Sequence, residues 1–343
     1  MQAEYDILGT IEQLLKSGWP LNMQLSLENQ RGEERIMNVE HLFQDFVEYV
    51  RDRQLFVEAV AVADENRVLL EHHFVPDHAR NIYSHTKSYM ATAVGMALAE
   101  GRLTLEDRLA DYFPESVPED PDPRLLQITL RDLLTMSSGF GHPYLMGDDR
   151  RQGIGFPDYM AYMMHLPMEQ TPGTVFEYST ADSILAGRMV EKAVGENLAA
   201  YLYPRLFQKL GQGWPQWEND PMGHPIGGGG MYMSVRDMMK LGQLYLAGGT
   251  WQGERLLDSG WVREATRKQI ETPQTENGDI WRCGYGYQFW CSPYPKAYRA
   301  DGAFGQVTTV LPENGLVIAV QCPEWGDFEK VKQALHTEIF SQL

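Results

Sequence analysis

A serine and a lysine stand three residues apart in the run YSHTKSYMATAVGMALAEG. They are Ser84 and Lys87. In a helix, residues three or four apart share a face, and this face continues through Ala91, Val94 and Leu98. Because these later positions are small or apolar, we expect Lys87 to lie on a buried face, one turn from Ser84.

Burial would change the chemistry of this lysine. Removing an ammonium group from water favours its neutral form, so we expect the pKa of Lys87 to be lowered. A neutral amine accepts a proton from a hydroxyl, and the helix N-terminus favours negative charge near Ser84. The pair is therefore a candidate activated nucleophile with its base. Two simpler interpretations stay open: Ser84 only caps the helix, or Lys87 extends to water.

The rest of the chain must position this pair. Apolar periodicity and turn residues predict helices over 37–55, 84–101, 128–140, 180–195, 234–248 and 327–340, a hairpin over 55–74, and strands over 283–291, 305–312 and 315–322. Strands near both ends of the chain, with helices between them, predict an α+β fold with one sheet made from both termini. We expect an α/β lobe of 1–105 and 235–343 and a helical lobe of 106–234, with the site in the crevice between them.

Charge and composition narrow the class of partner. The 343-residue chain carries a formal net charge of -18, which is poorly suited to nucleic acid. Its apolar runs are shorter than the ~20 residues that a membrane helix needs. The N-terminus lacks the basic start and apolar block of a signal peptide, and Cys283, Cys291 and Cys322 show no C-x-x-C spacing. These features favour a cytoplasmic protein with reduced thiols, while the oligomeric state stays open.

Several long blocks of the sequence resemble the serine β-lactamase and penicillin-binding-protein superfamily. Besides SHTK they are GMALAEGRLTLEDRLADYFPE, ITLRDLLTMSSG, PGTVFEYSTADSILAGRMVE, GGGGMYMSVRDMMKLGQLYLAGGTWQGERLL and YRADGAFGQVTTVLPENGLVIAV. The similarity is greatest to the class C-like branch, which includes esterases, D-aminopeptidases and 6-aminohexanoate-dimer hydrolases. The resemblance covers roughly residues 55–340 and implies a single β-lactamase-like domain over 1–343, with an antiparallel sheet flanked by helices.

The resemblance also implies roles for two further motifs. Tyr178-Ser179-Thr180 matches the family's Tyr-x-Asn motif, so Tyr178 would move the proton with Lys87. Thr180, a candidate substrate contact, replaces an asparagine that often touches the amide side chain of a β-lactam. Ala300-Asp301-Gly302 takes the place of Lys-Thr-Gly or His-x-Gly, so the basic residue that would bind a β-lactam carboxylate is missing.

The segment after this third motif would complete the site. The resemblance implies that the backbone N–H groups of Ser84 and Ala303 form the oxyanion hole. Asp301, Gly302 and Phe304 are then candidate substrate contacts, and Gly302 would keep the strand open to substrate. We hypothesise that Asp301, if it faces the crevice, favours cationic or amine-bearing substrates; the alternative is a simply solvated acid.

These features favour a cofactor-free serine hydrolase that acts through an acyl-enzyme on a small ester or amide. A true β-lactamase or D-Ala peptidase is the alternative within the family, and a non-catalytic ligand-binding or sensor module is the alternative of another class. We expect the partner to be a small-molecule acyl substrate. We expect no metal, since His72, His73 and His78 lack a completing carboxylate or cysteine at ligand spacing and are interpreted as surface residues.

Overall fold

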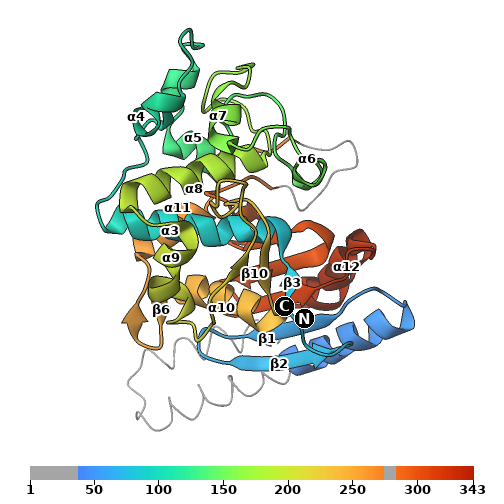
Figure 1. Ribbon diagram of the computed structural model, residues 1–343. Coiled ribbons are helices and arrows are strands. Elements are labelled where there is room, and N and C mark those ends of the chain that lie inside the picture. The colour runs from blue at the N-terminus through green and yellow to red at the C-terminus, as the bar shows by residue number, and fades with distance from the viewer. Residues whose placement is uncertain (1–37, 274–282) are drawn as a thin grey trace, which may run out of the picture. The chain divides into compact units, whose positions relative to one another are not determined.

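A computed structural model describes residues 38–273 and 283–343 of the chain (Figure 1). The chain divides into two compact units, which are described separately: residues up to Gln54 together with Lys332–Leu343, and Leu55–Val331. Residues 1–37, which the sequence assigns to the α/β lobe, lie outside the described residues.

In the first unit, residues 38–52 form a helix, as the spacing predicts. Its apolar positions, which include Val39, Phe43 and Phe46, are buried. The predicted final helix is also present. It begins as α12 (Phe328–Ala334), of which the residues up to Val331 belong to the second unit, and continues through the helical turns Leu335–Ile339 and Phe340–Gln342.

The second unit contains the main sheet. The described strands of this sheet are β1 (Ala59–Ala63), β2 (Val68–His73), β8 (Trp290–Cys291), β9 (Tyr298–Gly302), β10 (Gln306–Leu311) and β11 (Leu316–Gln321), in the order β2-β1-β11-β10-β9-β8. All neighbouring pairs are antiparallel. Ala61 of β1 pairs with Ala319 of β11, so the sheet joins two distant parts of the chain, as predicted.

Shorter strands lie outside the main sheet. They are β3 (Arg80–Asn81), β4 (Gln216–Trp217) and β5 (Met231–Met233), which form the sheet β3-β5-β4, and the hairpin β6 (Thr250–Trp251) with β7 (Glu254–Arg255). Met231 and Met233 of β5 are buried, whereas Tyr232 between them is exposed. This alternation is the one expected of a strand with one covered face.

Helices are the main regular structure in the region between the two parts of the main sheet. Their bounds are α3 (Thr86–Ala99), α4 (Leu109–Tyr112), α5 (Leu130–Leu134), α6 (Gly147–Gln152), α7 (Tyr159–Met164), α8 (Thr180–Val194), α9 (Leu198–Leu202), α10 (Val235–Leu246) and α11 (Ser259–Thr266). Short helical turns cover Tyr83–His85, Pro114–Ser116, Leu125–Gln127, Tyr203–Phe207 and Ala303–Gly305. Together with the antiparallel sheet they define an α+β fold.

The helix α10 packs against the sheet at short range. Ser234 caps it, accepting a hydrogen bond from the Asp237 N–H, as its position predicts. A Cβ atom placed on Gly242 would lie 2.6 Å from Val317 and 2.7 Å from Thr308. Glycine is therefore what allows α10 to contact β10 and β11 so closely.

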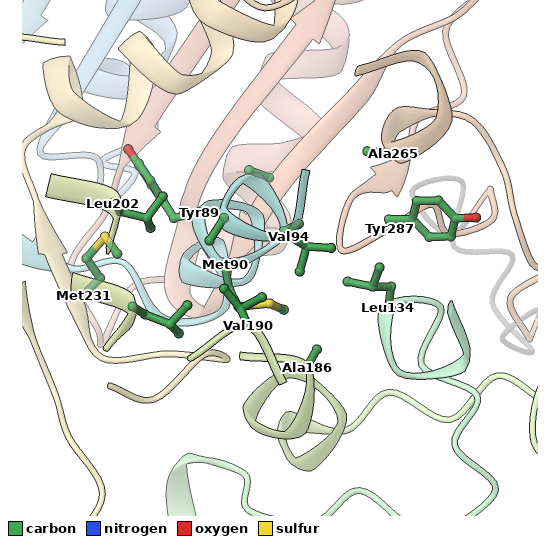
Figure 2. Packing of buried hydrophobic residues seen from close by; sticks show 14 of the residues in the cluster. Tyr89, Met90, Val94, Leu134, Ala186, Val190, Leu202, Met231, Ala265 and Tyr287 are labelled. Carbon is green, nitrogen blue, oxygen red and sulfur yellow. The ribbon is translucent and has the colours of Figure 1, made fainter. Parts of the chain in front are cut away.

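The helix α3 is the central element of the core. Figure 2 shows Tyr89, Met90 and Val94 on α3 among side chains from several other elements. The helix packs against α8, and Figure 1 shows the two running next to each other. A small residue of α3 also allows a close approach to α11, because a Cβ on Gly95 would lie 2.4 Å from Trp261.

The predicted strand over 283–291 is mostly wrong, because only β8 at its end is a strand. Gly284 and Gln288 have positive φ angles of 112° and 65°, which an extended strand does not allow. The Gln288 side chain is instead buried, where it donates to the Leu134 carbonyl at 3.0 Å and accepts from the Ser183 hydroxyl at 2.7 Å. This glutamine thus joins α5 and α8, a role that the local sequence does not reveal.

Candidate active site

Ser84 lies in the helical turn that precedes α3. The turn is tied to its surroundings by the Ile82 N–H, which donates to the Met231 carbonyl at 2.8 Å. Ser84 is partly exposed, whereas the residues of α3 that follow it are buried. The serine hydroxyl is therefore at the margin of the core, where both a base from inside and a substrate from outside can reach it.

Lys87 lies inside the core, one turn into the same segment. Its side chain is buried, with 1% of the residue exposed. The Lys87 Nζ donates to the Ser84 Oγ at 3.2 Å, to the Thr180 Oγ1 at 3.3 Å and to the Gly228 carbonyl at 2.8 Å. The predicted burial is confirmed, and the interpretation that Lys87 extends to water is wrong.

The protonation of Lys87 follows from this environment. The pKa of Lys87 is lowered to about 7, chiefly by burial and also by the positive charge of Arg150, while the Asp182 carboxylate acts in the opposite direction. Near neutral pH a large fraction of the side chain is thus an uncharged amine. Such an amine, 3.2 Å from a hydroxyl oxygen, has the geometry of a general base.

Tyr178 lies two residues before α8, next to this pair. The Lys87 Nζ is 5.0 Å from the centroid of the Tyr178 ring, and the tyrosine hydroxyl interacts with Ser84. Burial raises the pKa of Tyr178, with the Ser84 hydrogen bond opposing this shift. The Tyr178 ring stacks on Trp290 at 5.5 Å and meets Tyr285 edge-on at 6.1 Å. These aromatic contacts hold a protonated phenol beside the serine.

Thr180 is the first residue of α8. Besides accepting from Lys87, its hydroxyl donates to the Met146 sulfur at 3.4 Å. A Cβ on Gly228 would lie 2.8 Å from the Thr180 methyl group and 3.0 Å from the Lys87 Nζ. The threonine and the glycine backbone therefore confine the lysine closely from two sides.

The end of β9 reaches the segment just before Ser84. A Cβ on Gly302 would lie 2.1 Å from the Ile82 carbonyl oxygen, so only glycine allows this approach. Ala303 follows directly, and the Phe304 ring meets the Tyr83 ring at 5.1 Å. The structure thus brings together the two segments that carry the predicted oxyanion amides, those of Ser84 and Ala303.

Asp301 is partly exposed on β9, where its carboxylate accepts from the Arg299 Nε at 2.7 Å. The buried Arg299 guanidinium also donates to the Cys291 carbonyl at 3.0 Å. Because the charge of Asp301 is largely compensated by this neighbour, a preference for cationic substrates would require the pair to separate. That preference stays a hypothesis.

Two charged residues of this site, Arg150 and Asp182, were not predicted from the sequence. Arg150 on α6 donates from Nη1 to the Leu145 carbonyl at 2.7 Å, and a Cβ on Gly229 would lie 3.2 Å from its Nη2. Asp182 on α8 is fully buried and accepts from the Ser138 Oγ at 2.7 Å. Burial raises the pKa of Asp182 to about 7. The only sequence signal for Asp182 was an acid two residues after Thr180; Arg150 lies in a stretch without periodicity.

The histidines are held by neighbouring side chains. His73 pairs with Glu71, and the His78 Nε2 lies 3.4 Å from Glu58. His85 is buried, and its Nε2 lies 2.9 Å from the Thr308 hydroxyl, so this ring is engaged by the sheet. Within 38–273 and 283–343, no three metal-ligating side chains form a group that could hold a metal ion. None of the helices in these ranges is long and apolar enough to cross a membrane.

The fold and this constellation define the class of protein. A sequence model of the Beta-lactamase family matches residues 39–336, and the chain belongs to this family. Among its relatives, the 6-aminohexanoate-dimer hydrolase of Paenarthrobacter ureafaciens is 26% identical over 79% of this chain and 73% of that protein. Esterase EstB of Burkholderia gladioli is 27% identical over 59% of this chain and 64% of that protein.

A solved structure shows the same fold at low sequence identity. The penicillin-binding protein from Bacillus halodurans is 18% identical and superposes with a TM-score of 0.66, covering 86% of this chain and 100% of that one. The family and its named relatives support hydrolase activity for this protein.

Proposed function

We propose that this protein is a serine hydrolase that cleaves a small ester or amide through an acyl-enzyme on Ser84. The observation that carries the proposal is the 3.2 Å contact between the Lys87 Nζ and the Ser84 Oγ, made by a buried lysine whose pKa is lowered to about 7. A lysine placed only for stability would gain nothing from this arrangement, because burying an ammonium group is unfavourable.

The reaction would begin with attack of the Ser84 Oγ on the substrate carbonyl carbon. The serine proton passes to the neutral Lys87 Nζ as the new C–O bond forms. The negative charge on the carbonyl oxygen would be held by the N–H groups of Ser84 and Ala303. The tetrahedral intermediate then collapses and its bond to the leaving group breaks.

Tyr178 would supply the proton that the leaving group needs. Its raised pKa means that the hydroxyl is protonated at neutral pH, so it donates to the departing oxygen or nitrogen and takes back a proton from the Lys87 ammonium. Water then attacks the acyl-enzyme with Lys87 again as base. This second step releases the acid and restores the Ser84 hydroxyl.

The substrate class follows from what the second and third motifs lack. Thr180 stands where an asparagine would contact a β-lactam side chain, and its hydroxyl is already engaged by Lys87 and Met146. The third motif lacks its basic residue, and the acid there is paired with Arg299. We therefore rank small esters and open-chain amides above β-lactams. The names of the relatives, an esterase and an amide-dimer hydrolase, agree with this ranking.

Labelling with a fluorophosphonate tests the proposal directly. We expect a covalent mass on Ser84 by peptide mass spectrometry, absent in Ser84→Ala, and steady turnover of a p-nitrophenyl ester by the unaltered protein. Ser88→Ala is the matched control: this serine lies one turn further, where its hydroxyl donates to the Gln288 carbonyl at 2.8 Å. Its replacement should leave the labelling intact.

The remaining outcomes separate the alternatives. Labelling without turnover would indicate a sensor, and no labelling would indicate a ligand-binding module. Turnover of a chromogenic cephalosporin in preference to p-nitrophenyl esters and a 6-aminohexanoate dimer would indicate a β-lactamase. The last result would leave Ser84 as nucleophile but would contradict the substrate ranking.

A further inference from the structure

Two aromatic residues flank the amide groups of the proposed oxyanion hole. Tyr83 immediately precedes Ser84, and Phe304 immediately follows Ala303. Both have left-handed backbones, with φ angles of 48° and 59°. Large aromatic side chains rarely adopt this conformation, which glycine, asparagine and aspartate tolerate better. An aromatic residue with a left-handed backbone therefore occurs next to each of the two amide groups of the proposed oxyanion hole.

The two strained residues are in contact with each other. Their rings meet edge-on, with centroids 5.1 Å apart and an interplanar angle of 66°. This is a favourable geometry for an aromatic pair. Because each ring is attached next to one of the two amide groups, the ring contact connects the helical turn before α3 directly to the turn after β9.

Further bonds hold each turn in its unusual conformation. The Tyr83 N–H donates to the Asn81 Oδ1 at 2.8 Å, and its hydroxyl donates to Glu324. The Phe304 carbonyl accepts from the Gln306 Nε2 at 3.4 Å, and the next residue, Gly305, also has a positive φ of 86°. A strained conformation persists only where its surroundings determine it in several ways, and such residues cluster at functional sites.

Packing alone does not account for this arrangement. Phe304 remains 38% exposed, so its ring is only partly buried in return for an unfavourable backbone. A residue that keeps an unfavourable backbone conformation without a gain in stability is expected where a functional site needs a defined geometry.

We infer that Tyr83 and Phe304 are positioning residues whose ring contact fixes the spacing and direction of the Ser84 and Ala303 N–H groups. The inference rests on the proposed function, because it assigns the pair to the oxyanion hole of that reaction. The two rings themselves take no part in bond making. They act through the two backbone turns, which must hold donors toward an oxygen that becomes charged only during the reaction.

Glycine substitutions separate positioning from packing. Tyr83→Gly and Phe304→Gly remove the ring and also relieve the backbone, so we expect thermal midpoints equal to or above that of the unaltered protein. We expect the single-turnover acylation rate with a p-nitrophenyl ester to fall about tenfold to a hundredfold, with little change in KM. Tyr83→Phe, which keeps the ring, should retain most of the rate.

The pair should also behave as a unit. If one contact positions both amides, the double variant should lose little more activity than either single variant. The chain offers matched controls in Gln252 and Lys296, two exposed residues with positive φ angles of 48° and 57°. Their replacement by glycine should relieve strain in the same way and leave the acylation rate unchanged.

The outcomes distinguish this inference from the proposed function. If the unaltered protein is labelled at Ser84 and the glycine variants acylate at its rate, the positioning role is wrong and the hydrolase proposal stands. Rate and thermal stability falling together, without rescue by Tyr83→Phe, would indicate a packing role and would also overturn the inference. An unaltered protein that is neither labelled nor active would overturn the proposed function, and the positioning role with it.

Discussion

Arg150 and Lys87 lie against the same glycine pair. The Lys87 Nζ donates to the Gly228 carbonyl, and the Arg150 Nη2 lies 3.2 Å from where a Cβ of Gly229 would be. The Arg150 side chain is 10% exposed, and its Nε is a buried donor with no hydrogen-bond partner in the described chain, 3.6 Å from a Glu218 oxygen. A second, largely buried cation near the lysine makes protonation of the lysine less favourable.

Replacing Arg150 should therefore shift the pH dependence of the reaction. In Arg150→Gln the pKa of Lys87 should rise, because a positive charge that lowers it is removed. The acidic limb of the kcat/KM profile, which reports the base in the free enzyme, should move to higher pH. A series of stopped-flow measurements with a neutral ester would show the displacement.

The adjacent arginine provides the control for this experiment. Arg151 is 63% exposed and pairs with Asp148 on the protein surface. Arg151→Gln removes the same charge from the same helix, but in water, where its effect is screened. An equal displacement in both variants would show that overall charge, rather than the contact with the glycine pair, sets the profile.

Replacing Asp182 should displace the acidic limb of the kcat/KM profile in the opposite direction to Arg150→Gln. Its carboxylate raises the pKa of Lys87, so Asp182→Asn should lower that pKa and move the acidic limb to lower pH. Asparagine retains an oxygen that can accept from the Ser138 hydroxyl. Ser138→Ala should move the limb in the same direction but less, because loss of this hydrogen bond leaves more of Asp182 protonated. A displacement to higher pH in Asp182→Asn would contradict the assignment of its charge.

The sequence was most informative where structure depends on neighbouring residues in the chain. The helical stripe through Ser84, Lys87 and Ala91 predicted the burial of the lysine, since side-chain direction in a helix follows from spacing alone. Likewise Gly195 ends α8 with a positive φ of 77°, as glycine does at many helix ends. The division of the chain into two lobes stays a prediction.

The missed features depend on contacts between distant residues. The Gly228 carbonyl reaches Lys87 across 141 positions of sequence, and local periodicity does not indicate this contact; only the family resemblance places the run Gly227 to Gly230 near the site. Arg150 lies on a helix of six residues within an irregular stretch. By contrast, the Arg299–Asp301 pair was accessible, because alternate residues of a strand share a face.

Burial of Lys87 should also affect how the free energy of unfolding depends on pH. The pKa of Lys87 in the folded protein, about 7, lies below the ordinary lysine value of 10.5, so the unfolded chain binds this proton more tightly. Its contribution to the free energy of unfolding is therefore least favourable below pH 7 and improves as pH rises toward 10.5. Lys87→Met, which cannot be charged, should be inactive but more stable than the unaltered protein at pH 6, by up to a few kcal/mol.

This gain should shrink as the pH approaches the ordinary lysine value, and urea unfolding at several pH values measures it. Lys192→Met is the reference, since this lysine is 52% exposed and pairs with Glu115 at 3.3 Å. That variant should show no comparable trend with pH. A Lys87→Met variant that is less stable than the unaltered protein at pH 6 would mean that its three hydrogen bonds outweigh the cost of burying the charge.

Gly228 offers the most local test of the base geometry. An added methyl group would lie 3.0 Å from the Lys87 Nζ and 2.8 Å from the Thr180 methyl, so one of these groups must move. Gly228→Ala should lower kcat by about tenfold to a hundredfold, because a displacement of about 1 Å is enough to disturb proton transfer. At Gly213 the same methyl group would meet nothing within 4 Å, so Gly213→Ala should keep full activity. The acylation rates of both variants test this prediction, and their thermal midpoints exclude unfolding as the cause of a loss. A fully active Gly228→Ala would show that the position of the Lys87 amine is not critical to the reaction.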